Sequence, residues 1–222
     1  MKLKDLVNKL VLIKRSFLLV ALIAVWVAGA GFRPIEKESA PIVEEEWVRL
    51  ARGEVVIGAE KSQQGHGGRV LSAILIDSPV EPLWEVMVDH QRTPEFVPGL
   101  RDCRILERNE EGELLEHRVK PSWFLPEMTY VFRAWYRVYK RIDFKRIRGD
   151  LKALEGSWFF EETGGGNQTI LRYSVYVDPG FFLPQWLVRP LLKGELTNLM
   201  YAIRKRVAEL SRQEANIIEK NS

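Results

Sequence analysis

The chain has a single cysteine, Cys103, and it lacks the short motifs of several common classes of enzyme. One cysteine cannot form an intramolecular disulfide, and it cannot supply a cysteine cluster for zinc. The sequence contains no G-x-S-x-G, no phosphate-binding loop and no G-x-G-x-x-G. These absences exclude a disulfide scaffold, and they leave no sequence signature of an α/β-hydrolase, a P-loop enzyme or a dinucleotide-binding enzyme.

Histidine is also scarce, and the three histidines are far apart in the chain. His66 lies in a glycine-rich loop, His90 at the end of a predicted helix and His117 on a predicted strand. No pair has metal-ligand spacing, so we expect surface side chains, with His90 a favourable charge at a helix C-terminus. Asp89 and His90 form a conceivable acid/base pair, but neighbours in sequence need not face each other. We therefore predict no metal and no cofactor, and we name no catalytic residue.

The excess of positive charge lies at the N-terminus. Of the 33 basic residues 28 follow residue 30, and of the 30 acidic residues 29 do, so the remainder has a net charge of −1. A nucleic-acid-binding protein should carry its positive charge on the folded domain. We therefore expect no nucleic-acid partner.

Residues 1–32 have the features of a targeting segment. Ser16–Phe32 is uncharged and mainly apolar, follows a basic stretch, and contains Ala28-Gly29-Ala30, which fits the small-x-small rule for signal cleavage. About 17 residues is also the lower limit for spanning a bilayer. We predict a cleaved export signal or an uncleaved membrane anchor, and hence an exported, periplasmic or membrane-anchored protein. Residues 33–46 are acidic and predict a linker.

The end of the chain predicts a long amphipathic helix from Trp186 to Leu210. Six apolar residues recur there at steps of three or four and share one stripe; they are Leu192, Leu196, Leu199, Ile203, Val207 and Leu210. A helix of this kind needs an apolar surface to pack against. Our central prediction is that a curved antiparallel sheet wraps this helix, and that an apolar space large enough for a ligand lies between them.

The segments before this helix read mostly as strands. A short strand at Glu54–Ala59 and a strand at Arg69–Asp77 precede two proline-led short helices, which end near Asp89 and Pro98. Six strands joined by turns follow, at Arg101–Arg108, Glu113–Lys120, Met128–Tyr139, Arg141–Arg148, Leu154–Glu162 and Thr169–Val177. In the third of these six, the residues at 128, 130, 132, 134, 136 and 138 share one predicted face.

This order of elements, together with four stretches of sequence, resembles the START-like or helix-grip superfamily, and within it the polyketide cyclase/dehydrase and coenzyme Q-binding branch. The stretches are RVLSAILIDSPVEPLWEVMVDH, TPEFVPGL, GDLKALEGSW and DPGFFLPQWLV. The resemblance covers roughly Glu54 to Leu210. It implies an α+β helix-grip fold, in which a curved antiparallel sheet of about seven strands wraps a long C-terminal helix, with two short helices after the first strand. We place this domain at residues 47–213 and a tail at 214–222.

The resemblance also implies a cavity for an apolar or amphipathic molecule, closed by the long helix, without a shared catalytic residue. Tyrosine and tryptophan suit such a cavity because their rings pack against a ligand while their polar tips hydrogen-bond it. The alternative for each aromatic residue is plain core packing. The candidate ligand-binding residues are Trp84, Phe96, Tyr130, Phe132, Trp158, Tyr173, Trp186, Leu196 and Met200.

A basic band and two apolar loops suggest a membrane surface as a further partner. The band is rich in arginine and lysine and is either a solvated sheet face or a site of attraction to anionic lipid head groups; it comprises Arg133, Arg137, Lys140, Arg141, Lys145, Arg146, Arg148 and Lys152. Trp123, Phe124, Phe181 and Phe182 lie in loops apolar enough to enter a bilayer. We name these four as candidate membrane contacts.

Three functions are consistent with the sequence. The first is a non-enzymatic domain that binds a lipid, quinone or polyketide-like molecule in the cavity. The second is a cyclase or dehydratase that uses the same cavity and needs a positioned acid or base. The third is a protein-interaction module with a filled core, whose protein partner the sequence does not indicate.

Overall fold

The computed structural model describes residues 42–60, 68–110, 112–121, 125–180 and 185–221. The chain divides into two units, Met1–Pro41 and Ile42–Ser222, and all described residues belong to the second. The predicted leader and most of the predicted linker therefore lie outside the described residues. So do the four predicted membrane contacts, Trp123, Phe124, Phe181 and Phe182.

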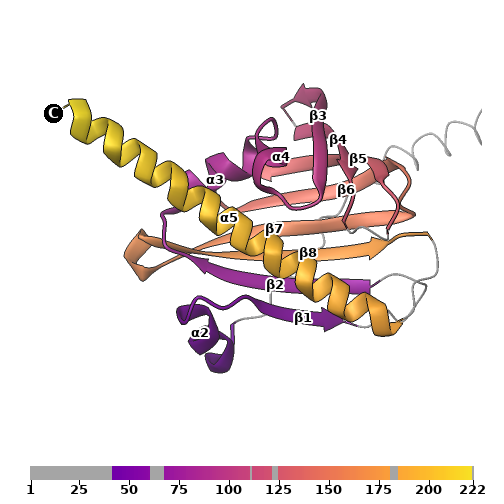
Figure 1. Cartoon of the computed structure of the whole chain (residues 1–222), viewed down its shortest axis with the longest axis horizontal. Coiled ribbons are helices and arrows are strands. Elements are labelled where there is room, and N and C mark those ends of the chain that lie inside the picture. Colours follow the sequence, from indigo (N-terminus) through magenta and orange to yellow (C-terminus); the bar gives the residue numbers. More distant parts are fainter. Residues whose placement is uncertain (1–41, 61–67, 111, 122–124, 181–184, 222) are drawn as a thin grey trace, which may run out of the picture. The chain divides into compact units, whose positions relative to one another are not determined.

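The second unit is built on one antiparallel sheet of eight strands, in the order β1-β2-β8-β7-β6-β5-β4-β3 (Figure 1). The strands are β1 (Val56–Glu60), β2 (Gly68–Ile76), β3 (Leu100–Asn109), β4 (Gly112–Val119), β5 (Met128–Arg137), β6 (Arg141–Gly149), β7 (Ala153–Thr163) and β8 (Gln168–Asp178). The predicted α+β fold is confirmed. The eighth strand is the short predicted segment near residue 56, which pairs with β2 at the sheet edge.

Alternation on β5 places side chains on the concave face of the sheet, and bulges help the sheet to curve. In β5, Met128, Tyr130, Phe132 and Ala134 point to the concave face, as the alternating pattern predicts. Val138, assigned to the same face, lies beyond the end of the strand and is 59% exposed. Register shifts interrupt β3 twice and the β5–β6 pair once. Because a bulge bends a strand and increases its twist, these shifts favour a curved sheet over a flat one.

Two glycines allow neighbouring strands to approach closely on the concave side. A Cβ added at Gly156 in β7 would lie 2.1 Å from the carbonyl oxygen of Ser174 and 2.6 Å from the ring of Phe144. Gly149 at the end of β6 has φ +116°, and a Cβ there would lie 2.4 Å from the carbonyl oxygen of Thr129. Only glycine fits both the space and the dihedral at position 149.

Two short helices, α3 (Val80–Val88) and α4 (Thr93–Phe96), follow β2 as predicted. A further helix, α2 (Glu44–Ala51), includes the last three residues of the predicted linker. Leu50 of α2 is fully buried against Val56 and Ile170. Ile170 alternates with Leu171, which belongs to the main core, so α2 covers the opposite face of the sheet from that core.

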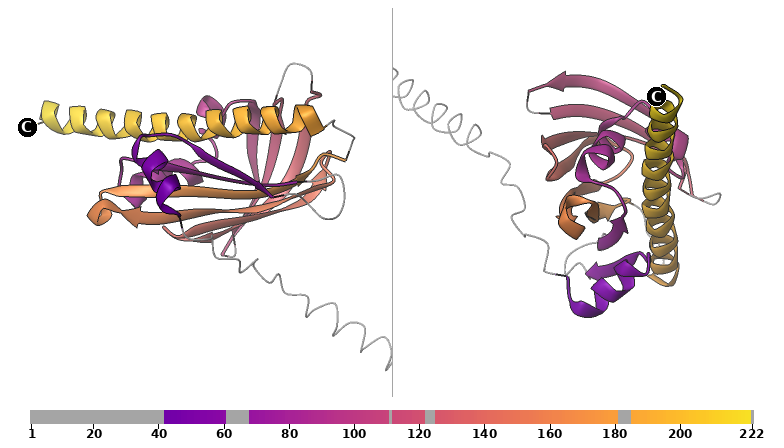
Figure 2. Two further views of the ribbon diagram at one scale, coloured as in Figure 1. Left: turned by 90° about the horizontal axis from the view of Figure 1, so that it is seen from below. Right: turned by 90° about the vertical axis from the view of Figure 1, so that its left-hand side faces the viewer.

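The long helix α5 (Gln185–Asn221) lies along the concave face of the sheet, as predicted (Figure 2). Its buried residues Leu196, Ile203 and Val207 pack into the main core, and Leu199 and Leu210 contact that core while partly buried. The remaining stripe residue, Leu192, has a side chain outside the described set. The helix continues well past its predicted end at Leu210 and includes most of the predicted tail.

Two arginines fasten α5 to neighbouring elements. Arg204 donates a hydrogen bond to the carbonyl oxygen of Gly53 at 2.9 Å, and Arg206 pairs with Glu95 at 3.0 Å. The first contact ties the helix to the turn between α2 and β1, and the second ties it to α4. No helix within the described part of the chain combines the length and the apolar character needed to cross a bilayer.

Candidate ligand cavity

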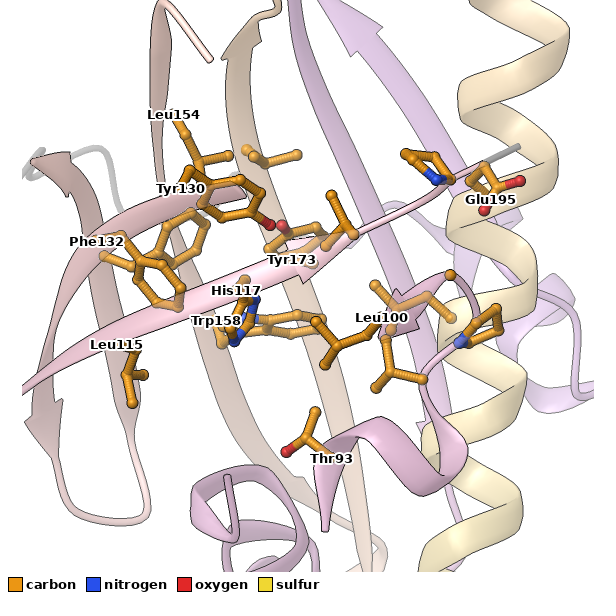
Figure 3. Close-up of a pocket in the computed structure, with 18 of the residues that line it drawn as sticks. Thr93, Leu100, Leu115, His117, Tyr130, Phe132, Leu154, Trp158, Tyr173 and Glu195 are labelled. Carbon is orange, nitrogen blue, oxygen red and sulfur yellow. The ribbon is translucent and has the colours of Figure 1, made fainter. Parts of the chain in front are cut away.

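A cavity of about 370 Å³ lies between the concave face of the sheet, the α3–α4 segment and α5. Figure 3 shows its wall, with Leu115, Phe132 and Tyr173 from the sheet on one side and Glu195 from α5 on the other. This volume falls within the range of small-molecule sites, about 300–1,000 Å³. The predicted space between sheet and helix is therefore present and is not filled by side chains.

The wall of the cavity is mainly apolar. The aliphatic and proline residues that line it include Val86, Met87, Pro98, Leu100, Leu115, Val119, Met128, Ile142, Leu151, Leu154, Val175, Val177, Leu199 and Ile203. Because these residues come from the sheet, α3, the loop after α4, and α5, the cavity exists only in the folded chain. Such a surface favours apolar ligands by removing their hydrocarbon from water.

Six of the nine predicted ligand-binding residues line the cavity; they are Phe96, Tyr130, Phe132, Trp158, Tyr173 and Leu196. The rings of Trp158 and Tyr173 are directly paired across β7 and β8. They stack with centroids 3.9 Å apart and an interplanar angle of 19°. Together they form a stacked aromatic pair in the cavity wall.

Trp84 and Met200 lie in the core rather than in the cavity wall. Met200 is fully buried, and the Trp84 ring contacts the rings of Tyr136, Tyr139 and Phe160 at centroid distances of 5.2–6.2 Å. Both residues are buried on their helices, but neighbouring side chains fill the space around them. The side chain of Trp186 is outside the described residues.

A buried polar network adjoins the cavity at His90, which is itself part of the wall. His90 Nε2 lies 2.8 Å from the Tyr136 hydroxyl and 3.0 Å from Glu113 Oε2. The Tyr136 hydroxyl donates to Glu113 Oε2 at 2.8 Å, and Arg108 pairs with the other carboxylate oxygen. The prediction that His90 is a surface side chain is wrong, because it is only 9% exposed.

The protonation of this network follows from its burial. Burial lowers the pKa of His90, and the carboxylate of Glu113 partly opposes that effect. Burial and the hydrogen bond to Glu113 both raise the pKa of Tyr136. Because the Tyr136 hydroxyl gives its hydrogen to Glu113, its oxygen can accept the hydrogen on His90 Nε2. His90 is therefore held in one orientation and one tautomer at the edge of the cavity.

His117, predicted on a strand and at the surface, lies in the cavity wall on β4. Its ring contacts the Phe132 ring edge-on at 4.7 Å. Burial, with a smaller effect of His90, lowers the pKa of His117 to about 3. Its Nε2 is buried without a hydrogen-bond partner among the described residues. His117 is therefore a neutral side chain at neutral pH.

Among the described lining residues only Glu195 is acidic, and it projects from α5 (Figure 3). Burial raises its pKa. Cys103 is half-buried on β3, as expected for a small apolar residue. Burial and the nearby carboxylate of Asp102 raise the pKa of its thiol to about 12, so the thiol stays protonated.

Acidic neighbours neutralise part of the basic band. Arg141 is buried and hydrogen-bonds Asp143 and Ser157, and Arg137 also pairs with Asp143. Lys152 pairs with Asp178 at 3.5 Å, and two further band residues, Arg133 and Lys145, pair with glutamates. The exposed sheet face therefore carries much less unbalanced positive charge than the sequence suggests.

Arg108, Glu113 and Tyr136 are not among the site residues predicted from the sequence. One signal was present, since Arg108 and Glu113 flank the hairpin loop and pair directly across β3 and β4. The other two members come from the turn after α3 and from β5, and only the curvature of the sheet brings them together. Nothing in the local pattern around His90 or Tyr136 indicates this contact.

Residues 76–204 match the family described as "Polyketide cyclase / dehydrase and lipid transport". The matched segment runs from the end of β2 into α5 and contains nearly the whole cavity wall. The chain belongs to this family. The name covers both enzymes and lipid carriers, so membership leaves the activity of the domain open. Among curated proteins, none has a sequence that matches this chain significantly.

Several solved structures share the fold of this chain. A START superfamily protein from Mycobacterium smegmatis is similar over 64% of this chain and 98% of its own, with a TM-score of 0.58 and 21% identity. A STAR-related lipid transfer protein from Xanthomonas axonopodis aligns over 76% of this chain and 97% of its own, with a TM-score of 0.61 and 11% identity. The Zhui aromatase/cyclase from Streptomyces aligns over 64% of this chain and 94% of its own, with a TM-score of 0.56 and 14% identity. At these identities, the similarity shows the helix-grip fold alone.

Proposed function

We propose that this domain binds an apolar or amphipathic small molecule, such as a lipid or a quinone, and carries or senses it without changing it chemically. The observation that carries the proposal is the apolar cavity of about 370 Å³ between the sheet and α5. Burial of apolar ligand surface contributes about 2.5 kcal/mol for each 100 Å², which is enough for binding without charged contacts.

The stacked pair of Trp158 and Tyr173 can be used to test this proposal. Replacing Trp158 with Ala removes one ring of the stacked pair and should weaken binding of an apolar aromatic probe, 2-ethylnaphthalene, by about tenfold. The matched control is Trp135→Ala, because Trp135 alternates with the cavity residue Ala134 and is absent from the described wall. Equal probe affinity in folded wild type and Trp158→Ala would count against the proposal.

A second candidate function is a cyclase or dehydratase, and the His90 network favours it. Such an enzyme needs a base or acid held in place next to its substrate. His90 lines the cavity and is oriented by Glu113 and Tyr136. The two functions differ in outcome: a carrier retains one unchanged molecule per chain, whereas an enzyme releases product repeatedly and loses turnover in His90→Gln.

The third interpretation, a protein-interaction module with a filled core, has less support because the cavity is not filled. We further propose that the N-terminal segment exports or anchors the protein, and that the loops containing Trp123 and Phe182 contact a membrane. That proposal predicts weaker sedimentation with anionic lipid vesicles for Trp123→Ser and Phe182→Ser. Equal sedimentation of wild type and both variants would contradict the membrane contact.

A further inference from the structure

The charges around the cavity restrict the ligands that it can hold. Among the described residues that line the cavity there is no lysine and no arginine. The nearby Arg108 is already paired with Glu113, and Glu195 places a carboxylate in the wall. An anionic ligand group would therefore leave water without gaining an opposite charge.

A cation is disfavoured in the same place. His117 resists protonation because burial lowers its pKa to about 3, so the environment at the sheet wall opposes positive charge. Glu195 is the acidic lining group that a cation could pair with, and it lies across the cavity on α5 (Figure 3). The interior therefore favours uncharged ligand groups, whether they donate or accept hydrogen bonds.

Two tyrosine hydroxyls are available to bind such a neutral group. The side chains of Tyr130 and Tyr173 both line the cavity, and Figure 3 shows their hydroxyl ends directed to the same region. The hydrogen bond that shifts the pKa of the Tyr136 hydroxyl has no counterpart among the causes of the pKa shifts of Tyr130 and Tyr173. Burial raises the pKa of both, and Tyr130 raises that of Tyr173 further, so both stay protonated and can donate.

The positions of these tyrosines are set by the fold. Tyr130 lies on β5 and Tyr173 on β8, three strands apart in the sheet, which is roughly 14 Å along a flat sheet. The curvature of the sheet turns both side chains toward the space over β6 and β7. The stack with Trp158 holds the Tyr173 ring, and contacts with His117 and Phe132 hold the Tyr130 ring.

We infer that the cavity selects, among molecules with the same apolar body, those with an uncharged oxygen, such as a ketone, an alcohol or a quinone carbonyl, over carboxylates and phosphates. The hydroxyls of Tyr130 and Tyr173 donate to that oxygen, while the surrounding apolar wall packs against the body of the ligand. This inference rests on the proposed binding function and names the chemical class of its ligand.

Three isosteric probes test the inference with the unmodified full chain. These are 2-acetylnaphthalene, which has a neutral carbonyl, 2-naphthoate, which is ionised at pH 7.5, and 2-ethylnaphthalene, which has no oxygen. We expect 2-acetylnaphthalene to bind at least about tenfold more tightly than 2-naphthoate, as measured by calorimetry or tryptophan quenching. Equal or tighter binding of 2-naphthoate overturns the inference and leaves the proposed function standing. Failure of all three probes to bind overturns both.

Conservative variants test the two hydroxyls. Tyr130→Phe and Tyr173→Phe each remove one oxygen and keep the ring, so the fold should be retained. Each should reduce the preference for 2-acetylnaphthalene over 2-ethylnaphthalene by about threefold to tenfold, with little change for 2-ethylnaphthalene. The control is Tyr201→Phe, because Tyr201 is exposed on α5 and absent from the described wall. An unchanged preference in both cavity variants overturns the assigned role of the hydroxyls.

Discussion

His117 links the cavity to the pH dependence of folding. Its pKa is about 3 in the folded chain, against an ordinary value of 6.5. Above pH 6.5 neither state holds the proton. Between pH 6.5 and about 3 the unfolded chain binds a proton that the folded chain does not, so the free energy of unfolding falls as the pH falls, by up to about 1.4 kcal/mol per pH unit.

We therefore predict that His117→Phe is less sensitive to acid than the wild type. The loss of unfolding free energy between pH 7 and pH 5 should be smaller by about 1–2 kcal/mol, as measured by urea denaturation at both pH values. His90, whose pKa is also lowered, is present in both proteins and largely cancels in the comparison. An identical loss in the two proteins would show that His117 is free to take up a proton when folded.

Glu113 is the residue on which the polar network depends, since it accepts from Arg108 and Tyr136 and lies beside His90. Glu113→Ala removes the carboxylate that Tyr136 and His90 contact beside the core, while the exposed Arg108 side chain can return to water. The variant should lower the free energy of unfolding by roughly 2 kcal/mol. Glu116→Ala on the same strand should cost less than about 1 kcal/mol, because its pair with Arg104 is partly exposed. Similar costs for the two variants would contradict the structural role of the network.

The sequence predicts the elements better than it predicts the site. The alternation on β5 and the stripe on α5 predict which faces are buried, because apolar residues at these spacings all lie on one side of the strand or helix. They do not specify which part of a buried face is left open. Trp158 and Trp84 have equally apolar surroundings in the sequence, yet Trp158 lines the cavity and Trp84 is surrounded by other rings.

The apolar residues of helix α5 are buried near its middle and exposed near its C-terminal end. Met200 is fully buried beneath the cavity wall, whereas Ile217 is 60% exposed on the same helix. Met200→Ala should lower the free energy of unfolding by about 2–5 kcal/mol, while Ile217→Ala should change it by less than about 0.5 kcal/mol. Urea denaturation of both variants checks this. A large effect of Ile217→Ala would indicate that the end of α5 has a partner that covers it.

At the scale of the whole molecule, the shape of the cavity and the chemistry of its wall follow from the same fold. An apolar space lies between the sheet and α5, and the fold places two histidines and two tyrosines in its wall with no lysine or arginine among the described lining residues. The size of that space depends on bulges and on glycines such as Gly156, whose effect on curvature is not readable from local sequence. Family membership is consistent with the same reading.

Native mass spectrometry of the full chain, purified without denaturation from cells that produce it, tests the central claim most directly. The account predicts one apolar, uncharged molecule bound per chain, released intact by organic solvent. Detection of the bare chain alone, before and after incubation with lipid extracts of those cells, would contradict it.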